Sequence, residues 1–194
     1  NYSAESVTIT KPYQQLFDNV QARLPDHLEC NWYDDGDKPP MRFGIRFKDS
    51  YYRKSPDHHS LKKHLKDFGM MGTRAWEKVI PDVYLNASHQ QRLDLLNGLM
   101  DTDGTCTFGG CKVGPNGEKI LRKSGSPSYS TSSKVLAEQI QYLVRSLGGI
   151  AKISTRIPHY THQGERKAGR VDYRVHIRYP NPNDLFTLDH KKDR

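Results

Sequence analysis

The stretch "LLNGLMDTDG", residues 95–104, decides the fold, because an apolar helical pattern runs directly into two acids and a glycine. The two acids, Asp101 and Asp103, lie on either side of Thr102. The C-terminus of a helix carries partial negative charge, so carboxylates are disfavoured there. We therefore expect something to offset them, and the candidates are a metal ion, a lysine or a buried hydrogen-bond donor.

The residues around this stretch predict one long helix, 88–102. Ser88 suits the N-cap, and Leu93, Leu96 and Met100 recur at helical spacing. Gly98 lies inside the helix, where a glycine costs ~1 kcal/mol relative to alanine. A glycine in such a place often lets another backbone approach closely. The leucine stripe itself is equally compatible with ordinary core packing.

The rest of the chain mixes strands and helices, which predicts an α+β fold. The predicted strands are 6–10, 42–48, 151–157 and 171–179, with a strand-rich stretch and an Asn-Gly hairpin within 105–130. The predicted helices are 13–24, 60–68 and 134–147, followed by a short helix start near the C-terminus. The order of strand, helix, strand and helix occurs twice, which indicates an internal duplication.

Charge is distributed unevenly along the 194 residues. Residues 1–111 carry a net charge of −1, whereas residues 112–194 carry +9. A basic half suggests a polyanionic partner, although a merely soluble basic surface would look the same. The hydrophobic content is 35%, and no run of ~18 apolar residues predicts a membrane span.

The cysteines and the N-terminal sequence predict an intracellular, reducing, cytoplasmic location. There are three cysteines, a number that argues against a disulfide framework, and no secretory signal is visible. Cys106 and Cys111 have no second pair nearby, so core or strand positions are favoured over zinc. His159 and His162 also lack further ligands at suitable spacing, so phosphate contact or solvation is favoured for them.

Basic side chains alternate with apolar ones in three predicted strands. The residues on these polar faces are Arg42, Arg46, Lys48, Lys152, Arg156, Arg174, His176 and Arg178. Two-stranded ribbons can enter the major groove of DNA, where arginine binds guanine with two hydrogen bonds. An ordinary antiparallel sheet with one wet face is the alternative. We prefer DNA binding, and predict that the three polar faces form one concave surface.

The stretch Leu96–Gly104 resembles the LAGLIDADG motif of homing endonucleases. It matches at Leu96, Gly98, Leu99, Asp101, Asp103 and Gly104, whereas Asn97 and Thr102 depart from the alanine of the motif. The element Lys78-Val79-Ile80-Pro81 and the segment 129–149 resemble the surroundings of the second motif in intein-encoded members. The similarity is clear over residues ~60–194 and looser before them.

The resemblance implies two pseudo-symmetric αββαββα halves with saddle-shaped antiparallel sheets, here 1–86 and 87–194. The two motif helices would pack at the centre, and Gly98 would let them approach closely. Only one motif occurs in residues 1–194, so we expect the first motif helix upstream of residue 1. A decayed, inactive first copy is the alternative.

The resemblance also implies roles at the motif. Asp103 would bind Mg²⁺ or Mn²⁺ at the scissile phosphate, with the carbonyl of Thr102 as a further ligand, while Asp101 would support the helix end. Lys78 and Lys191 (or Lys192) match the lysines that such enzymes place near the metal. Composition and spacing alone favour a solvated lysine at position 78.

The implied function is site-specific cleavage of double-stranded DNA, as in intron and intein homing. Such a hydrolase would leave short 3′ overhangs and act as a monomer through its internal duplication, with the protein-splicing domain of an intein in cis. The alternatives are a non-cleaving RNA maturase or transcriptional regulator on the same fold, and an inactive endonuclease remnant.

Overall fold

The computed structural model describes residues 7–33, 36, 41–48, 61–107, 111–113, 115–116, 119–121 and 126–192. Contacts divide the chain into two compact units, Asn1–Gly72 (unit 1) and Thr73–Arg194 (unit 2). Gly117 of the predicted Asn-Gly turn lies outside the described residues. Within the described part of the chain, no helix is both long and apolar enough to cross a membrane.

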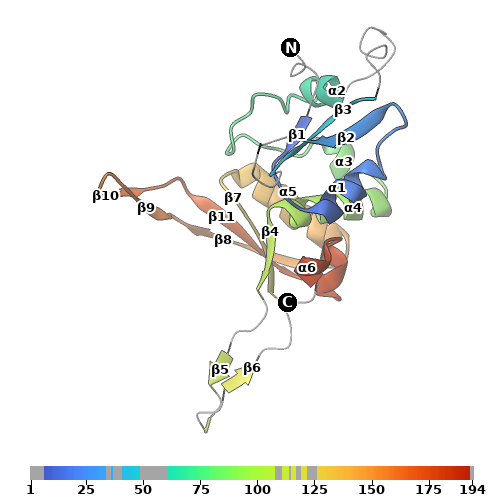
Figure 1. Ribbon diagram of the computed structural model, residues 1–194. Helices are drawn as coiled ribbons and strands as arrows, with labels where there is room; N and C mark the ends of the chain where they lie inside the picture. The colour runs from blue at the N-terminus through green and yellow to red at the C-terminus, as the bar shows by residue number, and fades with distance from the viewer. Residues whose placement is uncertain are drawn as a thin grey trace. The chain divides into compact units, whose positions relative to one another are not determined.

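Unit 1 is a three-stranded antiparallel sheet with helices, and its strand order is β1-β3-β2 (Figure 1). Its elements are β1 (Val7–Ile9), α1 (Gln14–Gln21), β2 (Leu28–Trp32), β3 (Phe43–Phe47) and α2 (Leu61–Asp67). The predicted helices 13–24 and 60–68 and the predicted strands 6–10 and 42–48 are confirmed. Strand β2 was not predicted, although Leu28, Cys30 and Trp32 alternate there with polar residues.

Aromatic packing holds α1 on one face of this sheet. The ring of Phe17 stacks on Trp32 with 5.1 Å between centroids and meets Phe43 edge to face at 5.2 Å. Phe43 is fully buried, and Leu28, Cys30, Ile45 and Phe47 are also buried. The apolar positions of β2 and β3 therefore face the helix, and the polar positions of these two strands face away from it.

Unit 2 contains a four-stranded antiparallel sheet with strand order β4-β7-β11-β8. The strands of this sheet are β4 (Gly104–Thr107), β7 (Ser126–Thr131), β8 (Ile150–Arg156) and β11 (Asp172–Arg178). Two hairpins, β5 (Cys111–Val113) with β6 (Lys119–Leu121) and β9 (His159–His162) with β10 (Glu165–Ala168), are inserted between strands. The helices are α3 (Asp82–Leu85), α4 (His89–Thr102), α5 (Lys134–Ser146), the 3₁₀ turn η3 (Pro182–Leu185) and α6 (Asp189–Lys192).

The two long helices of unit 2 begin at the residues that the sequence indicates. Ser88 caps α4 in a capping box with Gln91, and Ser133 caps α5 by accepting from the backbone N–H of Leu136. Leu96 and Met100 of α4 are fully buried, together with Ile140 of α5. The leucine stripe of α4 therefore packs in the core, against the apolar face of the sheet.

The two units share a chain order and a strand order. In each, a strand is followed by a helix and then by two antiparallel strands, the second of which lies at the centre of these three strands. Thus β1-β3-β2 in unit 1 corresponds to β7-β11-β8 in unit 2. The segment 73–86 makes its contacts within unit 2. The expected division into related halves at residue 86, and the pseudo-twofold axis between them, remain predictions.

Candidate functional site

The two acids of the motif have different environments. Asp101 is only 2% exposed, and its carboxylate accepts hydrogen bonds from the backbone N–H groups of Thr187 (3.0 Å) and Leu188 (3.3 Å) and from the Thr187 hydroxyl. These buried donors offset its charge at the unfavourable end of α4. Asp101 therefore ties α4 to the chain just before α6, in agreement with the supporting role expected from the resemblance.

Asp103, by contrast, is exposed at the C-cap of α4. Its backbone N–H donates to the Leu99 carbonyl at 3.0 Å, so the residue still belongs to the last helical turn. The next residue must be glycine, because a Cβ on Gly104 would lie 2.6 Å from the Cα of Met100. The turn from α4 into β4 is thus tightly fixed, and it leaves the Asp103 side chain at the surface.

Lys191 supplies the positive charge that the helix end requires. Its Nζ donates to the carbonyl oxygens of Met100 (2.8 Å) and Gly104 (2.9 Å), which bracket Asp103 in the chain. A cation at a helix C-terminus is stabilising. Lys192 instead approaches the carboxylate of Asp189 at 3.7 Å, so Lys191 is the lysine that reaches the motif. Its catalytic role stays a prediction.

Tyr129 is a neighbour of Asp103 that the sequence did not indicate. It lies on β7 directly opposite Gly104 and is only 4% exposed. Burial raises the pKa of its phenol to about 12, and the nearby Asp103 carboxylate adds to this shift. The phenol is therefore neutral at physiological pH. The alternating pattern of β7 could have placed this residue inside, but not beside Asp103.

The oxygen atoms at the end of α4 fit part of a site for a hard cation. Carboxylate and carbonyl oxygens are the ligands that Mg²⁺ prefers. Asp103 is the exposed carboxylate, and Thr102, whose hydroxyl donates to the carbonyls of Gly98 and Leu99, offers its own carbonyl. Among the described residues, no group of three or more metal-ligating side chains occurs.

Gly98 lies on the exposed side of α4. A Cβ built at this position would meet nothing within 4 Å, so the packing of unit 2 does not itself require a glycine there. The role expected from the resemblance, close approach of a second motif helix, stays a prediction.

The backbone around Lys78 is anchored to α5 by three hydrogen bonds. The Ser133 hydroxyl donates to the Lys78 carbonyl at 2.7 Å. The amide side chain of Gln139 accepts from the Ile80 N–H at 2.7 Å and donates to the Ile80 carbonyl at 2.8 Å. The Lys78 side chain itself is exposed. This exposure suits both a solvated and a catalytic lysine, so the catalytic role stays a prediction.

Strand register brings Lys78 and Asp103 to the same end of the sheet. Strand β4 begins at Gly104, opposite Tyr129, and β7 ends two residues later at Thr131. Ser133, to which the Lys78 carbonyl is bound, follows at that same end. Ser133 and Gln139 were not singled out from the sequence, because their role depends on a loop more than fifty residues away.

Five of the predicted DNA-binding residues share one face of the unit 2 sheet. Strands β8 and β11 pair His176 with Lys152 and Asp172 with Arg156. Arg174 and Arg178 lie two residues from His176 along β11, so they point to the same face. Of the intervening residues, Ala151, Val175 and Ile177 are buried in the core, and Ile153 and Tyr173 are partly buried against it. The alternation predicted for these two strands is therefore confirmed.

Hydrogen bonds between side chains fix several groups on this face. Arg174 Nε donates to the Ser130 hydroxyl at 3.2 Å, and His176 Nε2 lies 2.9 Å from the Ser154 hydroxyl. Arg156 is paired with the Asp172 carboxylate at 2.7 Å, which offsets its charge. The two serines were not singled out from the sequence, although their alternation with less polar residues places them on the same face.

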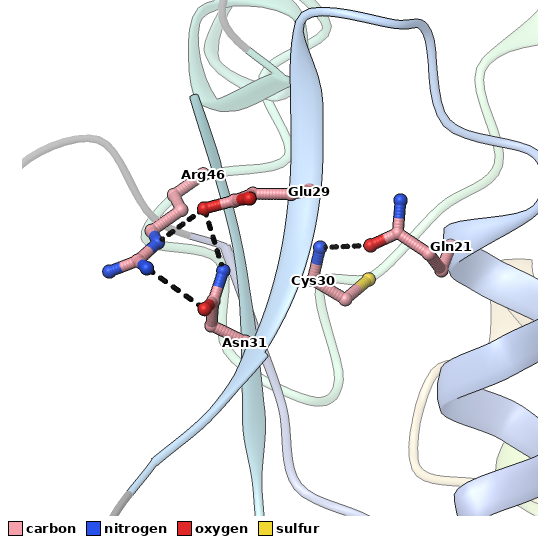
Figure 2. A network of polar contacts seen from close by, with 5 residues as sticks. All are labelled: Gln21, Glu29, Cys30, Asn31 and Arg46. Carbon is pink, nitrogen blue, oxygen red and sulfur yellow. Dashed lines mark hydrogen bonds and ion pairs between the residues drawn. The ribbon is translucent and has the colours of Figure 1, made fainter. Parts of the chain in front are cut away.

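The three remaining basic residues, Arg42, Arg46 and Lys48, are exposed on β3 and at its ends, in unit 1. The Arg42 guanidinium lies 5.0 Å from the ring centroid of Tyr33, and Arg46 is paired with Glu29 at 3.2 Å (Figure 2). These residues therefore belong to a different sheet from the other five. A single surface across all three strands stays a prediction.

Comparison with known proteins identifies the class of domain. Residues 90–179 match the profile of a family described as "LAGLIDADG-like domain". The chain is also 29% identical to a replicative DNA helicase DnaB of Mycobacterium intracellulare over 132 residues, which are 68% of this chain and 19% of that protein. It is 27% identical to a DnaB of Rhodothermus marinus over 175 residues, 88% of this chain and 17% of that protein. The chain thus spans less than a fifth of the length of either relative.

The role of Asp101 predicts a loss of stability in Asp101→Asn. The amide retains one acceptor and turns its N–H₂ toward the donors of Thr187 and Leu188, so we expect the free energy of unfolding to fall by about 1–3 kcal/mol. Asp94→Asn, on the exposed face of the same helix, is the matched control. Equal urea midpoints for the two variants would contradict the role of Asp101.

The anchoring of the Lys78 segment predicts a local effect in Gln139→Leu. The substitution leaves the N–H and carbonyl of buried Ile80 without partners, which should cost about 1–3 kcal/mol of stability. Hydrogen exchange at the Ile80 amide should accelerate, whereas it should not in Gln90→Leu on the exposed face of α4. Unchanged protection of Ile80 would show that Gln139 does not hold this segment.

Proposed function

Since the matched domain places this chain in the LAGLIDADG homing endonuclease family, we propose that it is a site-specific endonuclease of double-stranded DNA. The observation that carries the proposal is the separation of the two motif acids. The Asp101 carboxylate is buried and accepts structural hydrogen bonds. Asp103 is exposed, and Lys191 is held by hydrogen bonds to backbone carbonyls on either side of it in the chain. A helix end that served only the fold would have no use for the second acid.

Hydrolysis of a phosphodiester requires an activated water and neutralisation of charge on the phosphate. A Mg²⁺ or Mn²⁺ ion, when bound by the Asp103 carboxylate and the Thr102 carbonyl, would supply both. The chain's own contribution is to hold Asp103 rigidly at the turn through Gly104 and Lys191. Lys78, whose backbone is anchored and whose side chain is exposed, would stabilise developing negative charge.

The unit 2 sheet supports the DNA-binding part of the proposal. Its polar face carries Lys152, Arg156, Arg174 and Arg178 against one carboxylate, Asp172, in the half of the sequence that holds a net charge of +9. Basic groups supply affinity for phosphates, and the fixed polar groups among them suit contacts to base edges.

The relatives suggest the setting of the domain. The chain matches only a small part of each DnaB helicase, and a helicase does not require an endonuclease domain to unwind DNA. The simplest account is a mobile element inserted in a host protein, namely an intein whose splicing domain lies in cis. It would act inside the cell as a monomer, with both halves on one polypeptide.

A non-cleaving DNA- or RNA-binding protein on the same fold is the second candidate, and an inactive remnant the third. The observation that favours them is that residues 1–194 contain one motif acid of the type needed for cleavage. Metal-dependent nicking of duplex DNA separates the enzyme from both alternatives. Salt-dependent binding without nicking separates the binder from the remnant.

The first test of this function is Asp103→Asn in the full protein that carries the chain. We expect nicking of duplex DNA in Mg²⁺ to be abolished and binding to be largely retained, because the carboxylate is needed only for the metal. Asp94→Asn, which also neutralises an exposed acid of α4, should cleave normally. Full nicking activity in Asp103→Asn would refute the assignment of this residue.

The second test measures duplex binding across a salt series for Arg174→Ala and Arg178→Ala. A lost phosphate contact should weaken binding to all sequences and lower the salt slope by roughly one, whereas a lost base contact should cost ~1–3 kcal/mol at one position of the site. Lys134→Ala on α5, which packs against the opposite face, is the control. If both arginine variants bind as the parent does, this face does not carry the DNA.

A further inference from the structure

The polar face of the unit 1 sheet contains a closed network of three side chains. Arg46 of β3 lies directly opposite Glu29 of β2, and Asn31 is two residues further along the same strand. Arg46 Nε donates to Glu29 Oε1 at 3.2 Å, and Arg46 Nη2 donates to Asn31 Oδ1 at 2.8 Å. Asn31 Nδ2 closes the ring by donating to the same Glu29 oxygen at 3.0 Å (Figure 2).

The network fixes the guanidinium while leaving it at the surface. Glu29 and Asn31 occupy the edge of the guanidinium formed by Nε and Nη2, whereas Nη1 points away from both partners in Figure 2. The Arg46 side chain is 53% exposed. A guanidinium has five N–H donors in a planar fork, so the end formed by Nη1 and Nη2 still presents a pair of parallel donors.

The strand β2, which carries Glu29 and Asn31, is anchored to α1. The backbone N–H of Cys30, between Glu29 and Asn31, donates to the Gln21 side chain of α1 at 2.6 Å (Figure 2). On the buried side, Trp32 is stacked on Phe17. Arg46 is therefore held both by its polar partners and by a strand that is anchored to the helix.

We propose that Arg46 is a base-reading residue that binds the O6 and N7 atoms of one guanine in the major groove, with Glu29 and Asn31 holding it in position. The proposal rests on the proposed DNA-binding function. A residue that only neutralises phosphate gains nothing from a carboxylate at hydrogen-bond distance, because the carboxylate offsets its charge. A base-reading arginine gains from it, since the fork is fixed before binding and less side-chain entropy is lost.

The same arrangement occurs in unit 2. His176 lies opposite Lys152 and contacts the hydroxyl of Ser154, two residues further along that strand, just as Arg46 lies opposite Glu29 and contacts Asn31. Each sheet thus holds one side chain of its central strand by a diagonal partner. In this diagonal arrangement of unit 2, Lys152 takes the place of Glu29 and a histidine takes the place of Arg46, whereas the arrangement in unit 1 combines a fixed guanidinium with a neutralising acid.

The test begins with selection of binding sites from duplexes with a randomised core, using the full protein that carries the chain. One position of the recovered site should require guanine. Arg46→Lys keeps the charge but has no fork, so it should reduce the preference for guanine there by roughly 5- to 150-fold, the change that ~1–3 kcal/mol produces, without changing the salt slope. Replacing that guanine by 7-deazaguanine, which lacks the N7 acceptor, should weaken binding by the parent but not by Arg46→Lys.

Two further variants complete the test. Glu29→Gln removes the charge of the supporting group and should relax the guanine preference while binding to other sequences is kept. Arg23→Lys, in the turn just after α1, should behave as the parent does. Retained guanine preference in Arg46→Lys, or equal weakening at all sequences with a lower salt slope in Arg46→Ala, would overturn the base-reading role alone. Recovery of no duplex at all would instead overturn the proposed function and this inference with it.

Discussion

The end of α4 is the constraint on which unit 2 depends. A helix that ends in two acids is disfavoured by its own dipole, and the structure compensates with groups from the far end of the chain. Thr187 and Leu188 donate to buried Asp101, and the Lys191 ammonium binds the carbonyls of Met100 and Gly104. Because these contacts join residues more than eighty positions apart, the C-terminal segment must be docked before the turn that presents Asp103 is fixed.

In the main sheet of each unit, one face packs in the core and the other carries exposed polar side chains. In unit 2 the apolar positions of β8 and β11 form the core with α4 and α5, so the opposite positions are released from packing. Those positions carry Lys152, Arg174 and His176, and the last two contact serine hydroxyls. The same alternation operates in unit 1, where Phe43, Ile45 and Phe47 are buried and Arg46 is exposed. A surface residue can therefore change without disturbing the core, which suits a protein whose specificity resides on that surface.

Much of the fold could be predicted from the sequence because its signals are local. Capping by Ser88, the stripe of α4 and the alternation of β8 and β11 all depend on neighbouring residues, and all are confirmed. Strand β2 was missed although it alternates, because its five residues lie between a proline and a polar loop. The partners of Lys78 and Lys191 could not be predicted, since Ser133, Gln139 and the Gly104 carbonyl are brought to them only by tertiary packing. Local patterns thus indicated the candidate residues, whereas the contacts that hold them are long-range.

The difference between the two polar faces bears on what the domain would recognise. In unit 2 Lys152 lies opposite His176, and the carboxylate of Asp172 is paired with Arg156. In unit 1 the residue opposite Arg46 is Glu29, whose carboxylate is bound to Arg46, with Asn31 closing the network. A phosphate track needs uncompensated positive charge, whereas base reading needs fixed donors and acceptors. Under the proposed function, the unit 2 face would provide more of the salt-dependent affinity and the unit 1 face more of the sequence discrimination. Two sheets that share a strand order would in this way make different contributions to binding, because the difference lies in their exposed side chains and not in their backbone topology.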